Sequence, residues 1–112
     1  MDELVQRLAH EEHQVTVGGP QPSLEDFRWR LEDIAYVFIR FTETQGGTDL
    51  GVRIDKSATD LSQASFERRT GVVALEGTLT LNYEKVRCVV RIALETLNGT
   101  GHLVPLEESS TH

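Results

Sequence analysis

The sequence predicts a single α+β domain over residues 1–112, in which about five strands form a mainly antiparallel meander sheet with two N-terminal helices packed on one face. Three observations lead to this fold class. Apolar residues recur at helical spacing near the N-terminus, they alternate with polar residues from position 35 onward, and glycine-containing turns separate the alternating segments. A chain of 112 residues is long enough to close one hydrophobic core but not two.

Two helices are expected before the sheet. The first covers residues 2–13, where Leu4, Val5 and Leu8 form one apolar stripe. Glycines and prolines then interrupt the chain and leave room only for a brief strand at 15–17. The second helix covers 24–34, because Ser23 is a favourable N-cap and the apolar residues that follow it recur every three or four positions.

From residue 35 the apolar period changes to two, which predicts strands. The first hairpin is expected to fold about Gly46-Gly47, because glycines accept the positive φ angles of a tight turn. This turn places Arg40 directly opposite Arg53 on the returning strand. Like charges in that position destabilise a ladder, so we expect another group to neutralise the pair.

Three further strands are expected after a polar connection. Residues 56–70 contain Leu61, Ala64 and Phe66, which predicts one or two helical turns pinned to the core. The strands themselves are expected at about 71–81, 86–96 and 101–106, and residues 106–112 are expected to form a frayed tail.

Two turns set the register of these strands. A turn centred on Tyr83-Glu84 places apolar residues opposite one another, Leu75 facing Ile92 among them. Asn98-Gly99 is the strongest short hairpin signal in the chain and is expected to form the second turn. His102 would then lie across from Glu95 as a structural pair.

The face of the sheet turned away from the core combines cationic and aromatic side chains. It carries Arg40, Arg53, Arg87, Arg91, Tyr36 and Phe38. Arg91 is expected to pair with Glu76 on the neighbouring strand. Three explanations stand for the pair of arginines in the first hairpin: a carboxylate of this chain, an acidic partner protein or second copy, or a small carboxylate or phosphate ligand. An apolar centre ringed by arginines is typical of protein interfaces.

Trp29 lies on the side of the second helix opposite its apolar stripe, between Arg28 and Arg30. One interpretation is that the first helix, or residues 15–17, folds over the indole ring. The other is that Trp29 stays exposed as an anchor for a protein partner or for self-association, because Trp and Arg dominate binding hot spots.

Composition and motifs argue against nucleic-acid binding, a membrane span, a metal site and a reactive cysteine. The net charge of −7 repels nucleic acid, and no segment approaches the roughly 20 apolar residues of a membrane span, so a cytoplasmic protein is expected. The histidines of HEEH at 10–13 stand three apart, unlike those of H-E-x-x-H, and are expected at a solvated helix end. Cys88 is expected to be an inert core thiol. No catalytic residue, metal site or cofactor is predicted.

The leading hypothesis is a non-enzymatic binding or accessory protein that acts as a homodimer or with a protein partner. It would use the arginine-bearing sheet face and the surface around Trp29. The alternative is a small enzyme or binding protein for an anionic metabolite, held in a pocket of the curved sheet, with Tyr36, Glu76 or Asp55 as proton-transfer groups.

Overall fold

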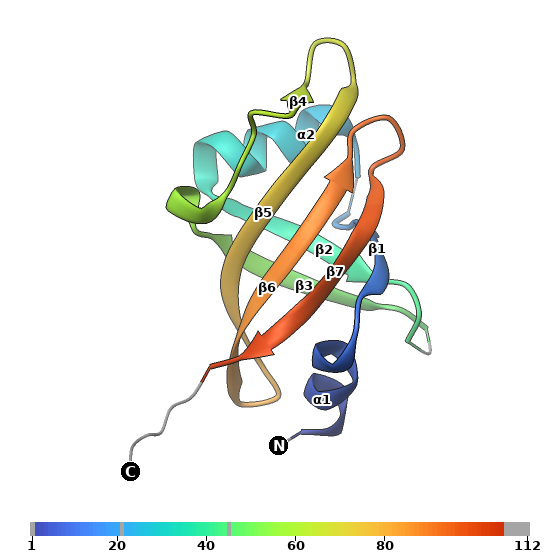
Figure 1. The fold of residues 1–112 in the computed structure, drawn as a ribbon, viewed down its shortest axis with the longest axis vertical. Helices are drawn as coiled ribbons and strands as arrows, with labels where there is room; N and C mark the ends of the chain where they lie inside the picture. Colours follow the sequence, from blue (N-terminus) through green and yellow to red (C-terminus); the bar gives the residue numbers. More distant parts are fainter. Residues whose placement is uncertain (1, 21, 45, 107–112) are drawn as a thin grey trace.

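Six antiparallel strands close into a barrel (Figure 1), so the open five-stranded sheet predicted from the sequence is wrong. The computed structural model describes residues 2–20, 22–44 and 46–106. The strands are β1 (His13–Val17), β2 (Tyr36–Phe41), β3 (Thr48–Ile54), β5 (Thr70–Leu81), β6 (Glu84–Ala93) and β7 (Asn98–Pro105), and the two-residue strand β4 (Ala64–Ser65) pairs with β5. Barrel strands that follow one another in the chain are neighbours, and the pairing of β7 with β1 closes the ring.

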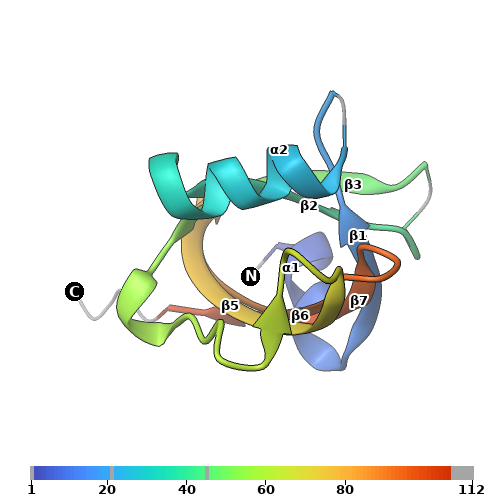
Figure 2. The same ribbon diagram turned by 90° about the horizontal axis from the view of Figure 1, so that it is seen from above.

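The barrel closes because each half of the chain supplies an apolar sheet face. Strands β1 to β3 form one antiparallel meander and β5 to β7 form another, and the two cross one another (Figure 1). Seen from above, the strands enclose a ring (Figure 2). Alternate residues of each barrel strand fill its interior, among them Ile39, Val52, Leu75 and Ile92. An open sheet would leave much of this apolar surface in water.

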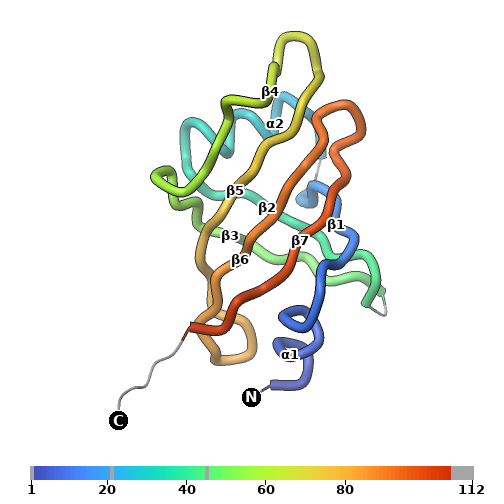
Figure 3. The backbone as a smooth tube through the Cα atoms, viewed as in Figure 1, coloured from blue at the N-terminus to red at the C-terminus, as the bar shows by residue number. Residues whose placement is uncertain are grey.

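The structure contains two short α-helices, α1 (Glu3–His10) and α2 (Leu24–Trp29), and α2 continues as a π-helical turn, η1 (Arg30–Ile34). They lie at opposite ends of the molecule, as the backbone trace shows (Figure 3), so the prediction that they pack on one face is also wrong. Both contribute to the same core, α1 through Val5 and Leu8 and α2 through Phe27. No helix among the described residues is long and apolar enough to cross a membrane.

Side-chain caps and one left-handed residue set the helix ends. The Asp2 carboxylate accepts hydrogen bonds from the backbone N–H groups of Leu4 and Val5, and Ser23 Oγ accepts one from Asp26. The predicted extent of 24–34 is confirmed for the second helical segment, which ends at Ala35 with φ 55°. The first helix ends at His10, earlier than predicted, because β1 already begins at His13.

The predicted strand faces are confirmed, but the predicted registers of the first two hairpins are wrong. In the first hairpin β2 ends at Phe41 and β3 begins at Thr48, and Arg40 pairs with Asp49. In the second, Asn82 and Tyr83 form the turn, with φ angles of 50° and 70°. Leu75 therefore pairs with Val90. Both registers differ from the predicted ones by an even number of residues. Each side chain therefore still lies on the face that was predicted for it.

The third hairpin turns earlier than predicted. Residues 94–97 form its loop, while Asn98 and Gly99 lie in β7 and pair with Ala93 and Ile92. A Cβ atom on Gly99 would lie 1.7 Å from the backbone oxygen of Arg91. The glycine therefore permits a close approach of β7 to β6, and the turn interpretation of Asn98-Gly99 is wrong.

The ring closes on its other side through a short contact between β3 and β5. Only Arg53 with Thr78 and Ile54 with Gly77 pair there among the described residues. The 56–70 connection contains one 3₁₀ turn, η2 (Lys56–Ala58), and then β4. Its apolar residues pack against the core as predicted; these are Leu61, Ala64 and Phe66. Beyond Arg53 and Thr78 the two strands are unpaired with one another in the described residues, which leaves a seam in the barrel wall.

Candidate functional site

Arg40 and Arg53 do not face one another. Arg40 donates from Nη1 to Asp49 Oδ2 and from Nη2 to the Gly46 carbonyl oxygen, both at 2.9 Å. In the ladder between β2 and β3, Arg53 lies opposite Tyr36 instead. The like-charge pair predicted from the sequence is therefore wrong, because the loop of the hairpin is longer than the assumed two residues.

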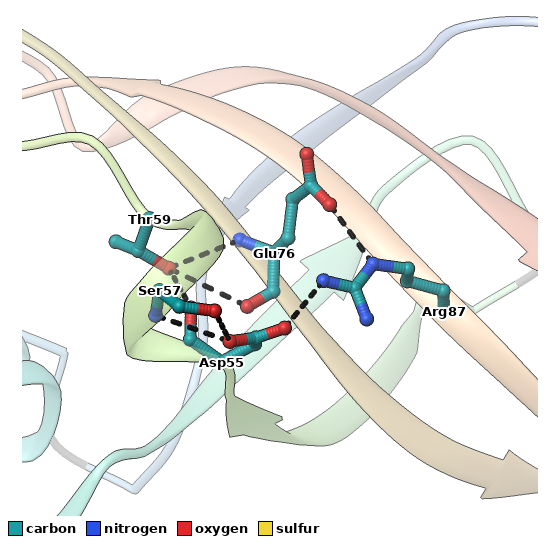
Figure 4. A network of polar contacts seen from close by, with 5 residues as sticks. All are labelled: Asp55, Ser57, Thr59, Glu76 and Arg87. Carbon is teal, nitrogen blue, oxygen red and sulfur yellow. Dashed lines mark hydrogen bonds and ion pairs between the residues drawn. The ribbon is translucent and has the colours of Figure 1, made fainter.

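Arg87 is neutralised by carboxylates of this chain (Figure 4). Its Nε donates to Glu76 Oε1 at 2.9 Å and its Nη2 donates to Asp55 Oδ2 at 2.7 Å. Glu76 therefore pairs with Arg87, and the predicted pair of Glu76 with Arg91 is wrong. Arg87, and then the Ser57 hydroxyl, lower the pKa of Asp55 from 3.8 to about 2, and the two carboxylates raise the pKa of Arg87.

This network joins strands from both halves of the barrel. Asp55 follows the end of β3, and its backbone N–H donates to the Glu76 carbonyl oxygen of β5 at 2.8 Å. The Thr59 hydroxyl donates to the Asp55 carbonyl oxygen at 2.9 Å. The arrangement in Figure 4 supports a structural role, since every charged group in it already has a partner.

Four residues form a surface that we call the aromatic patch: Trp29, Arg30, Tyr36 and Phe38. Trp29 is 48% exposed, so neither α1 nor β1 buries it. The Arg30 guanidinium carbon lies 5.6 Å from the Trp29 ring centroid and 4.9 Å from that of Phe38. Arg30 Nε also donates to Asp26 Oδ2 at 2.8 Å, which helps to hold the guanidinium close to both rings.

Tyr36 extends the aromatic patch toward the seam. Its ring contacts that of Phe38 edge to face, with centroids 5.5 Å apart and an interplanar angle of 86°. Tyr36 also lies over Gly51 of β3, where a Cβ atom would come within 2.0 Å of the phenol oxygen. Glycine at 51 therefore lets the ring lie across the barrel wall.

The seam between β3 and β5 forms a groove of about 510 Å³, which we call the seam groove. Its lining residues are Tyr36, Gly51, Arg53, Thr78, Leu79, Thr80, Lys85 and Leu106. Sequence reasoning named Tyr36 and Arg53 as site residues but missed Lys85 and Leu106. The alternation of side chains along the strand was enough to place Thr80 on the outer face. Its position opposite Lys85 could be predicted only with the correct register.

Arg91 lies in a different hollow, of about 260 Å³, whose lining includes Glu12, Glu76 and His102. The four predicted arginines are therefore distributed around the barrel and do not form one cluster. His102 pairs with Glu12, so its predicted pairing with Glu95 is wrong. The contact of His102 on β7 with Glu12, which precedes β1, joins residues that are far apart in the sequence. Local sequence patterns therefore could not predict it.

His13 and Cys88 are both buried. His13 belongs to β1, where Nδ1 lies 2.9 Å from Glu43 Oε1 and Nε2 lies 2.8 Å from the Arg7 carbonyl oxygen. The prediction of a solvated helix end is wrong for this residue. Burial raises the pKa of the Cys88 thiol to about 12, as expected for an inert core cysteine. No group of three or more potential metal-ligating side chains occurs within the described ranges.

The sequence matches no protein-family model and no curated protein. A function for this chain is therefore argued from the geometry of the aromatic patch and the seam groove.

Proposed function

We propose that this chain is a non-enzymatic binding protein that associates with a second copy of itself through the aromatic patch. The observation that carries the proposal is the exposed Trp29 ring, held by an arginine that also stacks on Phe38. Trp, Tyr and Arg are the residue types that dominate interface hot spots. A ring already fixed in place loses little conformational freedom on binding.

The charges around the patch favour a second copy as the partner. Arg30 is paired with Asp26 at 2.8 Å, and Arg28 with Glu32 at 3.3 Å. A two-fold interface brings the same patch of both copies together, so an unneutralised charge near its centre would meet its own image. With these two arginines already paired, the Trp29 rings can meet without that repulsion, while Arg53, which forms no ion pair within the described residues, lies beside Tyr36 on β3.

Solution mass tests this proposal. Light scattering over a range of protein concentrations should give a dimer for the wild type and a monomer for Trp29→Ala. Tyr83→Ala is the matched control, because Tyr83 is a fully exposed aromatic residue outside the patch and its loss should leave the dimer intact. Since Trp29 is the only tryptophan of the chain, its fluorescence should shift to the blue as the dimer forms. A wild type that stays monomeric, or an unchanged mass for Trp29→Ala, would contradict self-association.

An enzymatic function has less support. Two of the proposed proton-transfer groups, Asp55 and Glu76, already hold Arg87. The lowered pKa of Asp55 makes it a weak base near neutral pH.

A further inference from the structure

We infer that the seam groove binds a phosphate monoester. This ligand site goes beyond the proposed self-association and depends mainly on other residues, since only Tyr36 belongs to both the groove and the aromatic patch. Its cations are Arg53 and Lys85, both exposed, and neither forms an ion pair or a side-chain hydrogen bond with another described residue. The hydroxyls of Tyr36, Thr78 and Thr80 likewise have no hydrogen-bond partner in the described part of the chain.

The absence of acidic residues from the groove lining is unusual for this chain. The sequence has 18 acidic and 11 basic residues, yet none of the described residues that line the seam groove is Asp or Glu. The linings of three other hollows each include an acidic residue as well as a cation: Glu32 and Lys56, Asp49 and Arg40, and Glu12 and Glu76 with Arg91. The seam groove therefore keeps two positive charges available for a ligand.

The strand register brings these groups onto one surface. Tyr36 pairs with Arg53, and Arg53 pairs with Thr78, so the three residues form a row across β2, β3 and β5. Thr80 and Lys85 form a cross-strand pair close to that row. All five lie at alternate positions of their strands and share the outer face.

This set of groups suits a phosphate better than a single carboxylate. A phosphate monoester carries a charge of about −1.5 to −2 at pH 7, which matches two cations. The guanidinium of Arg53 can donate two parallel hydrogen bonds to phosphate oxygens, while Lys85 supplies a compact charge. Three hydroxyls can donate to the remaining oxygens.

The groove is also larger than a phosphate group requires. Its volume of about 510 Å³ lies within the common range of about 300–1,000 Å³ for small-molecule sites. Leu79, Leu106 and the Tyr36 ring supply apolar surface beside the polar groups. An organic group esterified to the phosphate can cover that surface, which favours a monoester over the free inorganic ion.

Isothermal titration calorimetry with phenyl phosphate tests this site in the chain of 112 residues at low ionic strength. We expect the wild type to bind phenyl phosphate at least about tenfold more tightly than benzoate or inorganic phosphate, and phenol to give no binding heat. Arg53→Gln and Lys85→Gln should each weaken phenyl phosphate binding by about tenfold or more, since each removes charge-assisted hydrogen bonds. Affinity should also fall as the pH drops below about 6, where the phosphate gains a proton.

Arg91→Gln is the matched control, because Arg91 is an exposed arginine on the outer face in a different hollow. It should bind phenyl phosphate like the wild type. Equal losses for Arg53→Gln and Arg91→Gln would overturn the site in favour of general charge attraction, and an absence of binding by the wild type would overturn it outright. Equal affinities for benzoate or for inorganic phosphate would overturn the assignment to a monoester. Circular dichroism of each variant checks that it remains folded.

The two proposals fail separately. Trp29→Ala should bind phenyl phosphate like the wild type, and Arg53→Gln should keep the wild-type solution mass. A change in both properties from either substitution would contradict the independence of the groove from the aromatic patch.

Discussion

Arg87 on β6 reaches across β5 and donates from Nη2 to Asp55 Oδ2 at a distance of 2.7 Å. The two residues come from different halves of the barrel, and Glu76 of the intervening strand accepts from Arg87 Nε. The ladder between β3 and β5 has only two residue pairs. Side-chain contacts therefore reinforce the barrel where its backbone pairing is shortest.

Asp55→Asn should destabilise the fold at neutral pH. The substitution removes the charge that Arg87 holds, and we expect the midpoint of thermal unfolding to fall by a few degrees, more at low than at high salt. Differential scanning calorimetry measures the change. Glu67→Gln is the control, because Glu67 forms a much more exposed pair with Arg28 and its loss should have little effect. Equal shifts for both variants would contradict a special role for Asp55.

The same pair should contribute to acid sensitivity. The folded-state pKa of Asp55 is about 2, below its ordinary value of 3.8. The unfolded chain therefore takes up this proton first, so the contribution is complete above about pH 4 and is lost as the pH falls from about 4 to about 2. Chemical denaturation at a series of pH values should show the wild type and Asp55→Asn converging in that interval. A constant difference between them down to pH 2 would contradict this assignment.

Gly77→Ala should strongly destabilise the barrel. Gly77 is buried, and an added Cβ atom would lie 2.2 Å from the backbone oxygen of Arg53. Backbone cannot move aside as a side chain can, so we expect a loss of about 2–3 kcal/mol in the free energy of unfolding. Gly101→Ala is a milder comparison, since its nearest neighbour is a methyl group of Val90 at 2.7 Å. Urea denaturation of both variants shows which one loses more free energy of unfolding. A smaller loss for Gly77→Ala than for Gly101→Ala would argue against a close approach of β3 and β5 at Gly77.

Tyr83→Gly should stabilise the protein. Tyr83 is fully exposed and has a φ of 70°, next to Asn82 with a φ of 50°. Glycine adopts this left-handed conformation without the steric cost of a Cβ atom, and Asn-Gly is the favoured sequence of such a turn. We expect a gain of roughly 0.5–1 kcal/mol in the free energy of unfolding. Tyr83→Ala keeps the strain, so a similar gain in that variant would refute this explanation.

Cys88 should be protected from thiol reagents in the folded state. Its side chain is buried and its pKa is raised to about 12, so little reactive thiolate is present. Labelling with an aromatic disulfide reagent should be slow in buffer and fast in denaturant. Rapid labelling of the native protein would show that the core around β6 opens readily.

The sequence predicted which side of each strand faces the core, because side chains alternate whatever the register. Ile39 and Val52 are inside and Arg53 is outside, as expected. Register itself was mispredicted, since an apolar pattern of period two matches equally well after a shift of two residues. The length of the connection from Phe41 to Thr48 and the left-handed Asn82 and Tyr83 distinguish the alternatives, and neither feature has a strong sequence signal.

Closure of the barrel lay outside what local patterns can predict. It depends on pairs such as His13 with Gly101, which are distant in the chain. For the same reason, the candidate sites could be predicted only in part. Helical spacing placed Trp29 away from the core, but its link to Phe38 through Arg30 is a tertiary contact. Lys85 was missed because its neighbours in the groove come from other strands.

The pairing of β1 with β7 has a consequence for synthesis of the chain. On the ribosome, β1 emerges early but lacks one of its two ladder neighbours until residues 98–105 have been translated. Until then the nascent chain holds an unsatisfied strand edge, at which it can adhere to other polypeptides. We expect the barrel to close only after β7 has been translated, and slowly, because the closing contacts join segments that are far apart in the sequence.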